Sequence, residues 1–232
     1  MKAAVFPAGL AFVLLVSCAS LPEIRPAVSA SAEKNFVCPF PFPSEKTRFI
    51  HAIEARAAGK TKGAVIGVTL VDPETRHLSC AIMTAEGLVL FEADSTPAGI
   101  QIHRALPPFE SPAFARNMMD DIELIFLAPS GLIEKKGFSP EGRPMCRWRQ
   151  DAGGFIDVAA DAEGLWRISR YNASRALSRS VRLEAEAATP FGRIELAAKG
   201  LVGYTLIMTL IETEPAGPEA VSGAGAAQEK NP

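Results

Sequence analysis

The sequence predicts a mainly β domain with two helices, an α+β fold in which helices cover an antiparallel sheet. The first observation is a series of about ten short runs that alternate or are rich in β-branched residues, separated by turn residues. The second is a pair of segments, 44–57 and 112–127, whose apolar residues recur at helical spacing. The third is that several runs are apolar on both faces, so the sheet needs cover on both faces or an apolar cavity on one.

The chain begins with a segment that is typical of a secretory signal. Lys2 precedes an apolar run over residues 3–16, which is shorter than the about 20 residues that cross a bilayer. The run leads into Leu-Val-Ser-Cys at residues 15–18, which resembles the lipobox of bacterial lipoproteins. The resemblance implies that residues 1–17 are a signal peptide and that Cys18 becomes the acylated first residue. The next residue is alanine rather than aspartate, which implies sorting to the outer membrane, facing the periplasm.

Residues 18–43 are expected to form the lipidated amino terminus and a proline-rich tether. Proline is excluded from helix and sheet interiors, and this segment contains Pro22, Pro26, Pro39, Pro41 and Pro43. Its aromatic residues, Phe36, Phe40 and Phe42, are expected to pack the end of the tether on the domain. Residues 215–232 consist mostly of Gly, Ala, Pro, Glu and Ser and are expected to be a disordered tail. One folded domain is therefore expected over residues 44–214.

The folded domain is expected to begin with a helix over residues 44–57. Ser44 is a suitable amino-terminal cap, and Gly59 is a suitable stop. The apolar residues at helical spacing are Phe49, Ile50, Ile53 and Ala57. The period then changes to two, and strands are expected at 64–71, 78–84, 88–93 and 100–106. The middle two are expected to form a hairpin across residues 85–87.

A second helix is expected over residues 112–127. Ser111 is a suitable cap, followed by proline at the first helical position. Its apolar residues are spaced by four and are Phe114, Met118, Ile122 and Phe126, while Asp120, Asp121 and Glu123 occupy the other face. Strands are expected again at 145–150, 155–159, 165–171, 180–187, 193–198 and 204–211.

Composition and motifs argue against several classes of function. Lys and Arg number 24 against 26 Asp and Glu, so there is no basic excess to favour nucleic acid. His51, His77 and His103 have no second ligand at metal-binding spacing and are expected at the surface or rim. The sequence has no nucleophile elbow, phosphate loop or dinucleotide fingerprint. Asp120 and Asp121 do not face each other on a helix, which favours a solvated face over an acid–base pair. We therefore expect no enzymatic activity, no metal and no cofactor.

Three cysteines remain once Cys18 is assigned to lipid. An extracytoplasmic compartment permits a disulfide, and Cys38–Cys80 is the preferred pair, because it would clip the proline-rich segment to the domain. Three free thiols are the alternative, and either Cys80 or Cys146 could be a small core residue.

Four arginines lie near the two tryptophans in the second half. They are Arg147, Arg149, Arg167 and Arg170, beside Trp148 and Trp166. One hypothesis is a basic and aromatic patch for lipid head groups. The other is sheet alternation, with arginine on the wet face and tryptophan in the core.

The order of these features resembles the lipoprotein carrier and receptor families LolA and LolB. The resemblance covers roughly residues 44–212 and is carried by Ala55-Arg56-Ala57-Ala58-Gly59 leading into 64–71, the hairpin 78–93, and the helix 112–127 with the late strands. It implies a curved antiparallel sheet that forms a half-open barrel covered by helices, with a hydrophobic cavity for acyl chains. The LolB family has an apolar leucine on a protruding loop, whereas the loop 94–99 here has no large apolar residue.

Two hypotheses for function follow from this resemblance. The first is an outer-membrane lipoprotein that carries or receives lipid or lipoprotein acyl chains. The cavity is then expected to be lined by Ile66, Val68, Leu90, Phe114, Met118, Ile122 and Phe126. The alternative is a non-enzymatic structural or assembly lipoprotein with a filled core, which acts through a periplasmic protein partner.

Overall fold

A computed structural model describes residues 21–26, 36–161, 165–186, 189–200 and 203–217. These residues contain twelve strands and one helix. The strands of the first half are β1 (Thr47–Ala57), β2 (Lys60–Asp72), β3 (His77–Met83), β4 (Val89–Thr96) and β5 (Gly99–Ala105), followed by the helix α2 (Pro112–Phe126). Those of the second half are β6 (Leu132–Phe138), β7 (Pro144–Arg149), β8 (Phe155–Ala160), β9 (Leu165–Tyr171), β10 (Leu177–Glu186), β11 (Thr189–Ala198) and β12 (Tyr204–Pro215). In the described part of the chain, no helix is long and apolar enough to cross a membrane.

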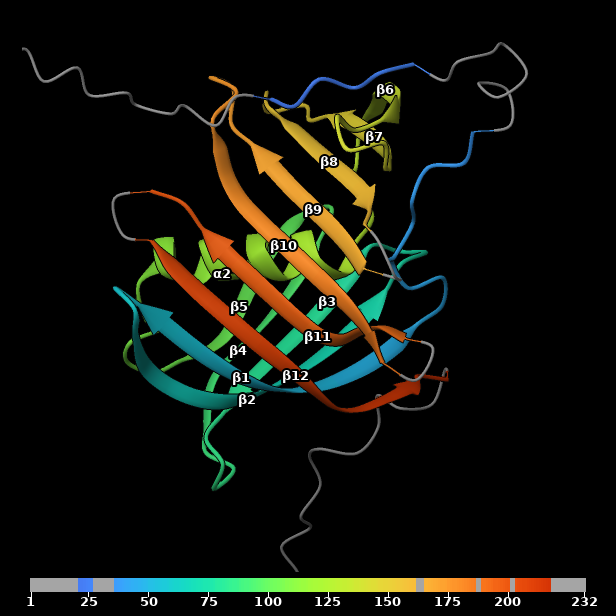
Figure 1. Ribbon diagram of the computed structural model, residues 1–232. Helices are drawn as coiled ribbons and strands as arrows, with labels where there is room; N and C mark the ends of the chain where they lie inside the picture. Colours follow the sequence, from blue (N-terminus) through green and yellow to red (C-terminus); the bar gives the residue numbers. More distant parts are fainter. Residues whose placement is uncertain (1–20, 27–35, 162–164, 187–188, 201–202, 218–232) are drawn as a thin grey trace, which may run out of the picture.

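All twelve strands form one antiparallel sheet in the order β5-β4-β3-β2-β1-β12-β11-β10-β9-β8-β7-β6. The first and last strands, β1 and β12, therefore pair in the middle of the sheet, and β5 and β6 are its edges. In the chain, α2 connects these two edges. Figure 1 shows the sheet bending so that α2 lies behind β10 and β11. Buried residues of both halves join α2 in one hydrophobic core, which places the helix on the concave face.

The predicted helix over residues 44–57 is wrong, because this segment forms β1. Its hydrogen bonds run to β2 on one side and to β12 on the other. Phe49 and His51 are buried in the core and Ile53 packs against it, whereas Ile50 alternates to the other face. A spacing of four, as from Phe49 to Ile53, also keeps two residues on one face of a strand. The pattern therefore could not distinguish the two structures at these positions.

The predicted half-open barrel covered by two helices is also wrong. The described chain is a single open sheet with one helix, α2, which occupies the place of the second predicted helix. Its first residue is Pro112, and Ser111 has extended backbone at the capping position. The predicted hairpin exists as β3 and β4, which pair from Leu78 to Met83. The sequence does not predict β6, whose exposed and largely charged residues do not alternate.

The described parts of the predicted tether lie against the folded domain. Phe36 makes an edge-to-face contact with Phe138, with ring centroids 5.5 Å apart. Phe42 is buried in the core, whereas Phe40 is exposed and touches only the ring of Phe42 among the described aromatic residues. The predicted packing of this segment by its aromatic residues is confirmed for Phe36 and Phe42.

Candidate functional site

The structure does not bring the seven predicted cavity residues together. Ile66 and Val68 alternate along β2 with buried residues, and Leu90 precedes the buried Phe91 on β4. Because successive side chains point to opposite faces of a sheet, these three lie on the outer face, away from α2. The other four predicted residues, Phe114, Met118, Ile122 and Phe126, are on α2 itself.

The carboxyl-terminal half of α2 packs on a core that its own side chains fill. Phe126 is fully buried, and its ring centroid lies 5.1 Å from that of Phe49 and 5.2 Å from that of Phe191. His51 completes this group at 5.9 Å from Phe126. His51 is fully buried and its Nε2 lies 3.1 Å from the carbonyl oxygen of Phe191, so its predicted surface position is wrong. Phe126 is thus a core residue.

The amino-terminal half of α2 leaves apolar side chains open to solvent beside the edge strand β5. Phe114 is 45% exposed, and Met118 and Ile122 are half-buried one and two turns further on. On β5, Ile102 is 41% exposed and pairs with the buried Ala93, so it faces the same side as α2. We call this the β5–α2 surface, made of Ile102, Phe109, Phe114, Met118 and Ile122.

Phe109 connects this surface to the core. Its ring centroid lies 5.6 Å from that of Phe114 and 6.0 Å from that of the fully buried Phe91. Contiguous exposed apolar side chains on a protein surface commonly mark a site that binds a ligand or partner. The β5–α2 surface is therefore the candidate apolar binding site.

Polar contacts fix α2 to both halves of the sheet. Asp121 is 2% exposed and accepts hydrogen bonds from Arg179 Nε at 2.7 Å and from the Tyr204 hydroxyl. Burial and the adjacent carboxylate raise the pKa of Tyr204 far above its usual value, so it stays a donor at neutral pH. On the other side, Glu123 accepts a hydrogen bond from Ser95 of β4. The predicted solvated face of α2 is therefore wrong at Asp121.

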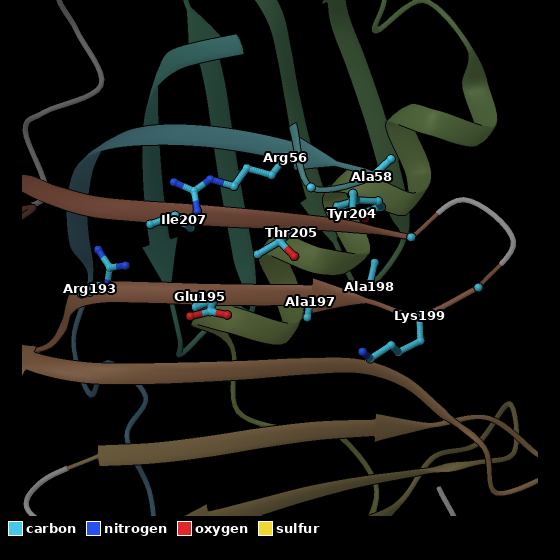
Figure 2. A pocket seen from close by; sticks show the side chains of 13 residues that line it. Arg56, Ala58, Arg193, Glu195, Ala197, Ala198, Lys199, Tyr204, Thr205 and Ile207 are labelled. Atoms are coloured by element: carbon cyan, nitrogen blue, oxygen red, sulfur yellow. The ribbon is translucent and has the colours of Figure 1, made fainter. Parts of the chain in front are cut away.

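The outer face of the sheet carries two shallow hollows whose lining includes charged and small residues, and Figure 2 shows the larger of the two. Their volumes are about 510 and 250 Å³, and both are lined by Arg56, Arg193 and Ile207. Arg56 is held by Glu54, with Nε 2.8 Å from a carboxylate oxygen. The charged lining differs from the apolar lining that acyl chains require. These hollows do not replace the predicted cavity.

Ser79, His77, His103 and Asp94 come together on the outer face of β3 to β5. Asp94 accepts hydrogen bonds from Ser79 Oγ at 2.5 Å and from His103 Nε2 at 2.7 Å. A catalytic triad needs the serine to donate to histidine and the histidine to carboxylate, but here Ser79 donates to the carboxylate directly. Among the described residues, no group of three or more His, Cys, Asp or Glu is arranged to hold a metal ion.

The predicted Cys38–Cys80 disulfide is wrong, because Cys38 is bonded to Cys146 of β7. Cys80 is a free thiol within the core, where burial raises its pKa to about 12. The sequence does not show which strand the amino-terminal segment lies against, so it could not identify the partner of Cys38. Cys18 lies outside the described residues, so its predicted lipidation stays a prediction.

The four arginines near the tryptophans do not form one patch. Arg147 is buried and bonds Asp157 through two contacts of 2.6 and 2.7 Å. Arg149 pairs with Glu134, Arg167 pairs with Asp161, and Arg170 bonds a backbone carbonyl of α2. Trp148 is buried in the core, as the alternation hypothesis predicts, but Arg147 is not on a wet face.

Comparison with known proteins shows a related fold. No family model and no curated protein matches the chain. Among solved structures, it is similar to the LolA superfamily protein NE2245 from Nitrosomonas europaea, with a TM-score of 0.51 and 12% sequence identity. The match covers 76% of this chain and 88% of the other. At this identity the likeness shows the fold alone, and it agrees with the LolA-like fold that the sequence predicts.

Proposed function

We propose that this protein is a lipid-anchored envelope protein that binds acyl chains of lipids or lipoproteins on its β5–α2 surface. The observation that carries the proposal is the apolar row along α2, in which Phe114 is exposed and Met118 and Ile122 are half-buried, continued by the exposed Ile102 at the edge of the sheet. The fold of a LolA superfamily protein supports a carrier or receptor rather than an enzyme. The lipobox-like sequence that ends at Cys18 supports a membrane anchor in the periplasm, at the outer membrane.

The shape of the site indicates how a chain would bind. The core beneath Phe126 is filled, so the ligand would lie along the open β5–α2 surface rather than enter a deep cavity. Met118 offers a flexible and polarisable side chain that adapts to a mobile alkyl chain. Binding would remove Phe114 from water, at a gain of about 25 cal/mol for each Å² of apolar area covered.

A pair of matched variants tests this proposal. The purified protein is titrated with a fluorescent fatty acid, and its bound lipids are identified by native mass spectrometry. Phe114→Glu should weaken probe binding at least about tenfold, which corresponds to about 1.4 kcal/mol. Leu88→Glu changes an apolar residue that is 54% exposed at the β3–β4 turn, outside the β5–α2 surface, and should leave binding unchanged. Equal probe affinities of the two variants would count against the site.

The filled core favours one alternative, a structural or assembly lipoprotein that acts through a periplasmic protein partner. In that case the pure protein takes up no fatty acid, and the β5–α2 surface instead binds protein. Cross-linking in cells through a photoreactive residue at position 114 distinguishes the two, because a lipid adduct and a protein adduct differ in mass.

A further inference from the structure

The chain is attached to β6 and β7 from its first described residues. Arg25 and Phe138 exchange two backbone hydrogen bonds, of 2.9 and 2.8 Å. Ile24 is 8% exposed. Gly137 lies directly beneath this crossing, because a Cβ atom there would be 2.1 Å from the carbonyl oxygen of Arg25. Any other residue at this position would push the segment off β6.

A second contact fixes the segment closer to its amino-terminal end. The carbonyl oxygen of Pro22 accepts a hydrogen bond from Arg147 at 2.9 Å. Arg147 is itself held by its buried ion pair, and its register partner on β6 is Lys135. Leu21 therefore begins the described chain beside β6 and β7, rather than at the end of a free tether.

This attachment limits the distance between the body and a bilayer. Only three residue steps separate Cys18 from Leu21, and an extended chain spans about 3.5 Å per step, or about 10 Å in all. The head-group region on each side of a bilayer is about 5–8 Å thick. If Cys18 carries acyl chains, β6 and β7 are held within a few ångströms of the head groups.

We propose that the edge strand β6 lies in the interface of an anionic bilayer and orients the domain on the membrane. The proposal rests on the acylation of Cys18, which belongs to the proposed function. Leu132 and Ile133 at the start of β6 are 82% and 51% exposed, and Lys135 and Lys136 follow them.

The chemistry of this strand fits that partner. Leu132 is a large, exposed apolar side chain that would enter the interface, while Lys135 nearby would meet anionic head groups. The acidic residue between them, Glu134, is paired with Arg149 at 2.7 Å, which neutralises it. Lys135 and Arg149 outnumber Glu134, so this part of the strand and its partner arginine carry net positive charge toward the membrane.

Lipid-dependent quenching of a fluorophore tests the orientation. The full-length, processed protein carrying Leu132→Cys is labelled with an environment-sensitive dye and reconstituted in phosphatidylethanolamine–phosphatidylglycerol vesicles, with and without brominated acyl chains. The matched control is Leu88→Cys, which labels an exposed leucine in the turn between β3 and β4, two strands that are far from β6 in strand order. Cys80 is buried and Cys38 and Cys146 are bonded, so the dye reacts at the introduced thiol.

We expect quenching at position 132 to exceed that at position 88 at least threefold. Equal quenching at both positions overturns the proposal. A blue-shifted emission at 132 without quenching also overturns it, because it indicates that two copies pair through their β6 edges. The mass of the amino-terminal peptide is measured in the same sample. Absent acyl chains refute the anchoring itself, whereas an acylated protein with equal quenching refutes only the orientation.

Discussion

Replacing Phe126 by alanine should destabilise the protein far more than the same change at Phe114. Phe126 is fully buried against Phe49 and Phe191, so its removal leaves a cavity in a packed core. Such a change costs about 3–5 kcal/mol, and in a domain of this size about 4 kcal/mol lowers the melting temperature by roughly 8–16 °C. Phe114 is 45% exposed on the same helix, so its truncation should cost about 1 kcal/mol or less.

Urea unfolding, followed by circular dichroism, measures both variants against the unmodified protein. The slope of the free energy against urea should stay constant, which shows that only stability changed. A cost below about 1.5 kcal/mol for Phe126→Ala, together with stronger uptake of a fatty-acid probe, would refute the reasoning. It would mean that Phe126 lines an open cavity after all.

Three further predictions concern the polar and covalent links of the fold. Asp121→Asn should lower the free energy of unfolding by about 3 kcal/mol. This is the lower end of the range for breaking a buried ion pair, because 18% of the Arg179 side chain is exposed. Calorimetry measures the change, and a loss below about 1 kcal/mol contradicts the prediction. Reducing Cys38–Cys146, which closes a separation of 108 residues, should lower the unfolding free energy by up to about 4–5 kcal/mol in urea titrations with and without reductant. Burial lowers the pKa of His51 more than its hydrogen bond to a backbone carbonyl raises it. As the pH falls, His51 is therefore protonated in the unfolded chain before it is protonated in the folded protein. Stability should therefore fall below about pH 6.5, by up to about 1.4 kcal/mol per pH unit, and His51→Gln should flatten this slope in acid titrations.

The sequence predicted those parts of the fold in which the spacing of the apolar residues and the cap or turn residues at the ends of an element indicate the same structure. The predicted helix over residues 112–127 has a serine at the capping position, a proline at its first position and a four-residue apolar spacing, and it is present as α2. The hairpin of β3 and β4 has alternating strands around a turn with a glycine, and it too is present. Both elements depend on residues that are close together in the sequence, so the sequence alone can predict them.

The parts that could not be predicted depend on distant pairing. Residues 47–57 form a strand because β12, more than 140 residues later, supplies hydrogen bonds along one of its edges. Ile66 and Val68 were expected in the site because β2 is apolar on both faces, and alternation alone does not say which face α2 covers. The partner of Cys38 likewise depends on where residues 21–43 cross β6 and β7.

The pairing of β1 with β12 has a consequence for how the chain reaches this fold. Thr47 meets Pro215 across the middle of the sheet, so the two halves join only after the last strand has been synthesised. Until then, β1 and β11 each present an open edge, and contacts of such long sequence separation form slowly. A chain that ends before Tyr204 would lose the strand that connects β1 to β11, so that only α2 and the core would hold the two half-sheets together. The final strand, which contributes few buried side chains of its own, thus determines whether the two half-sheets pair into one continuous sheet.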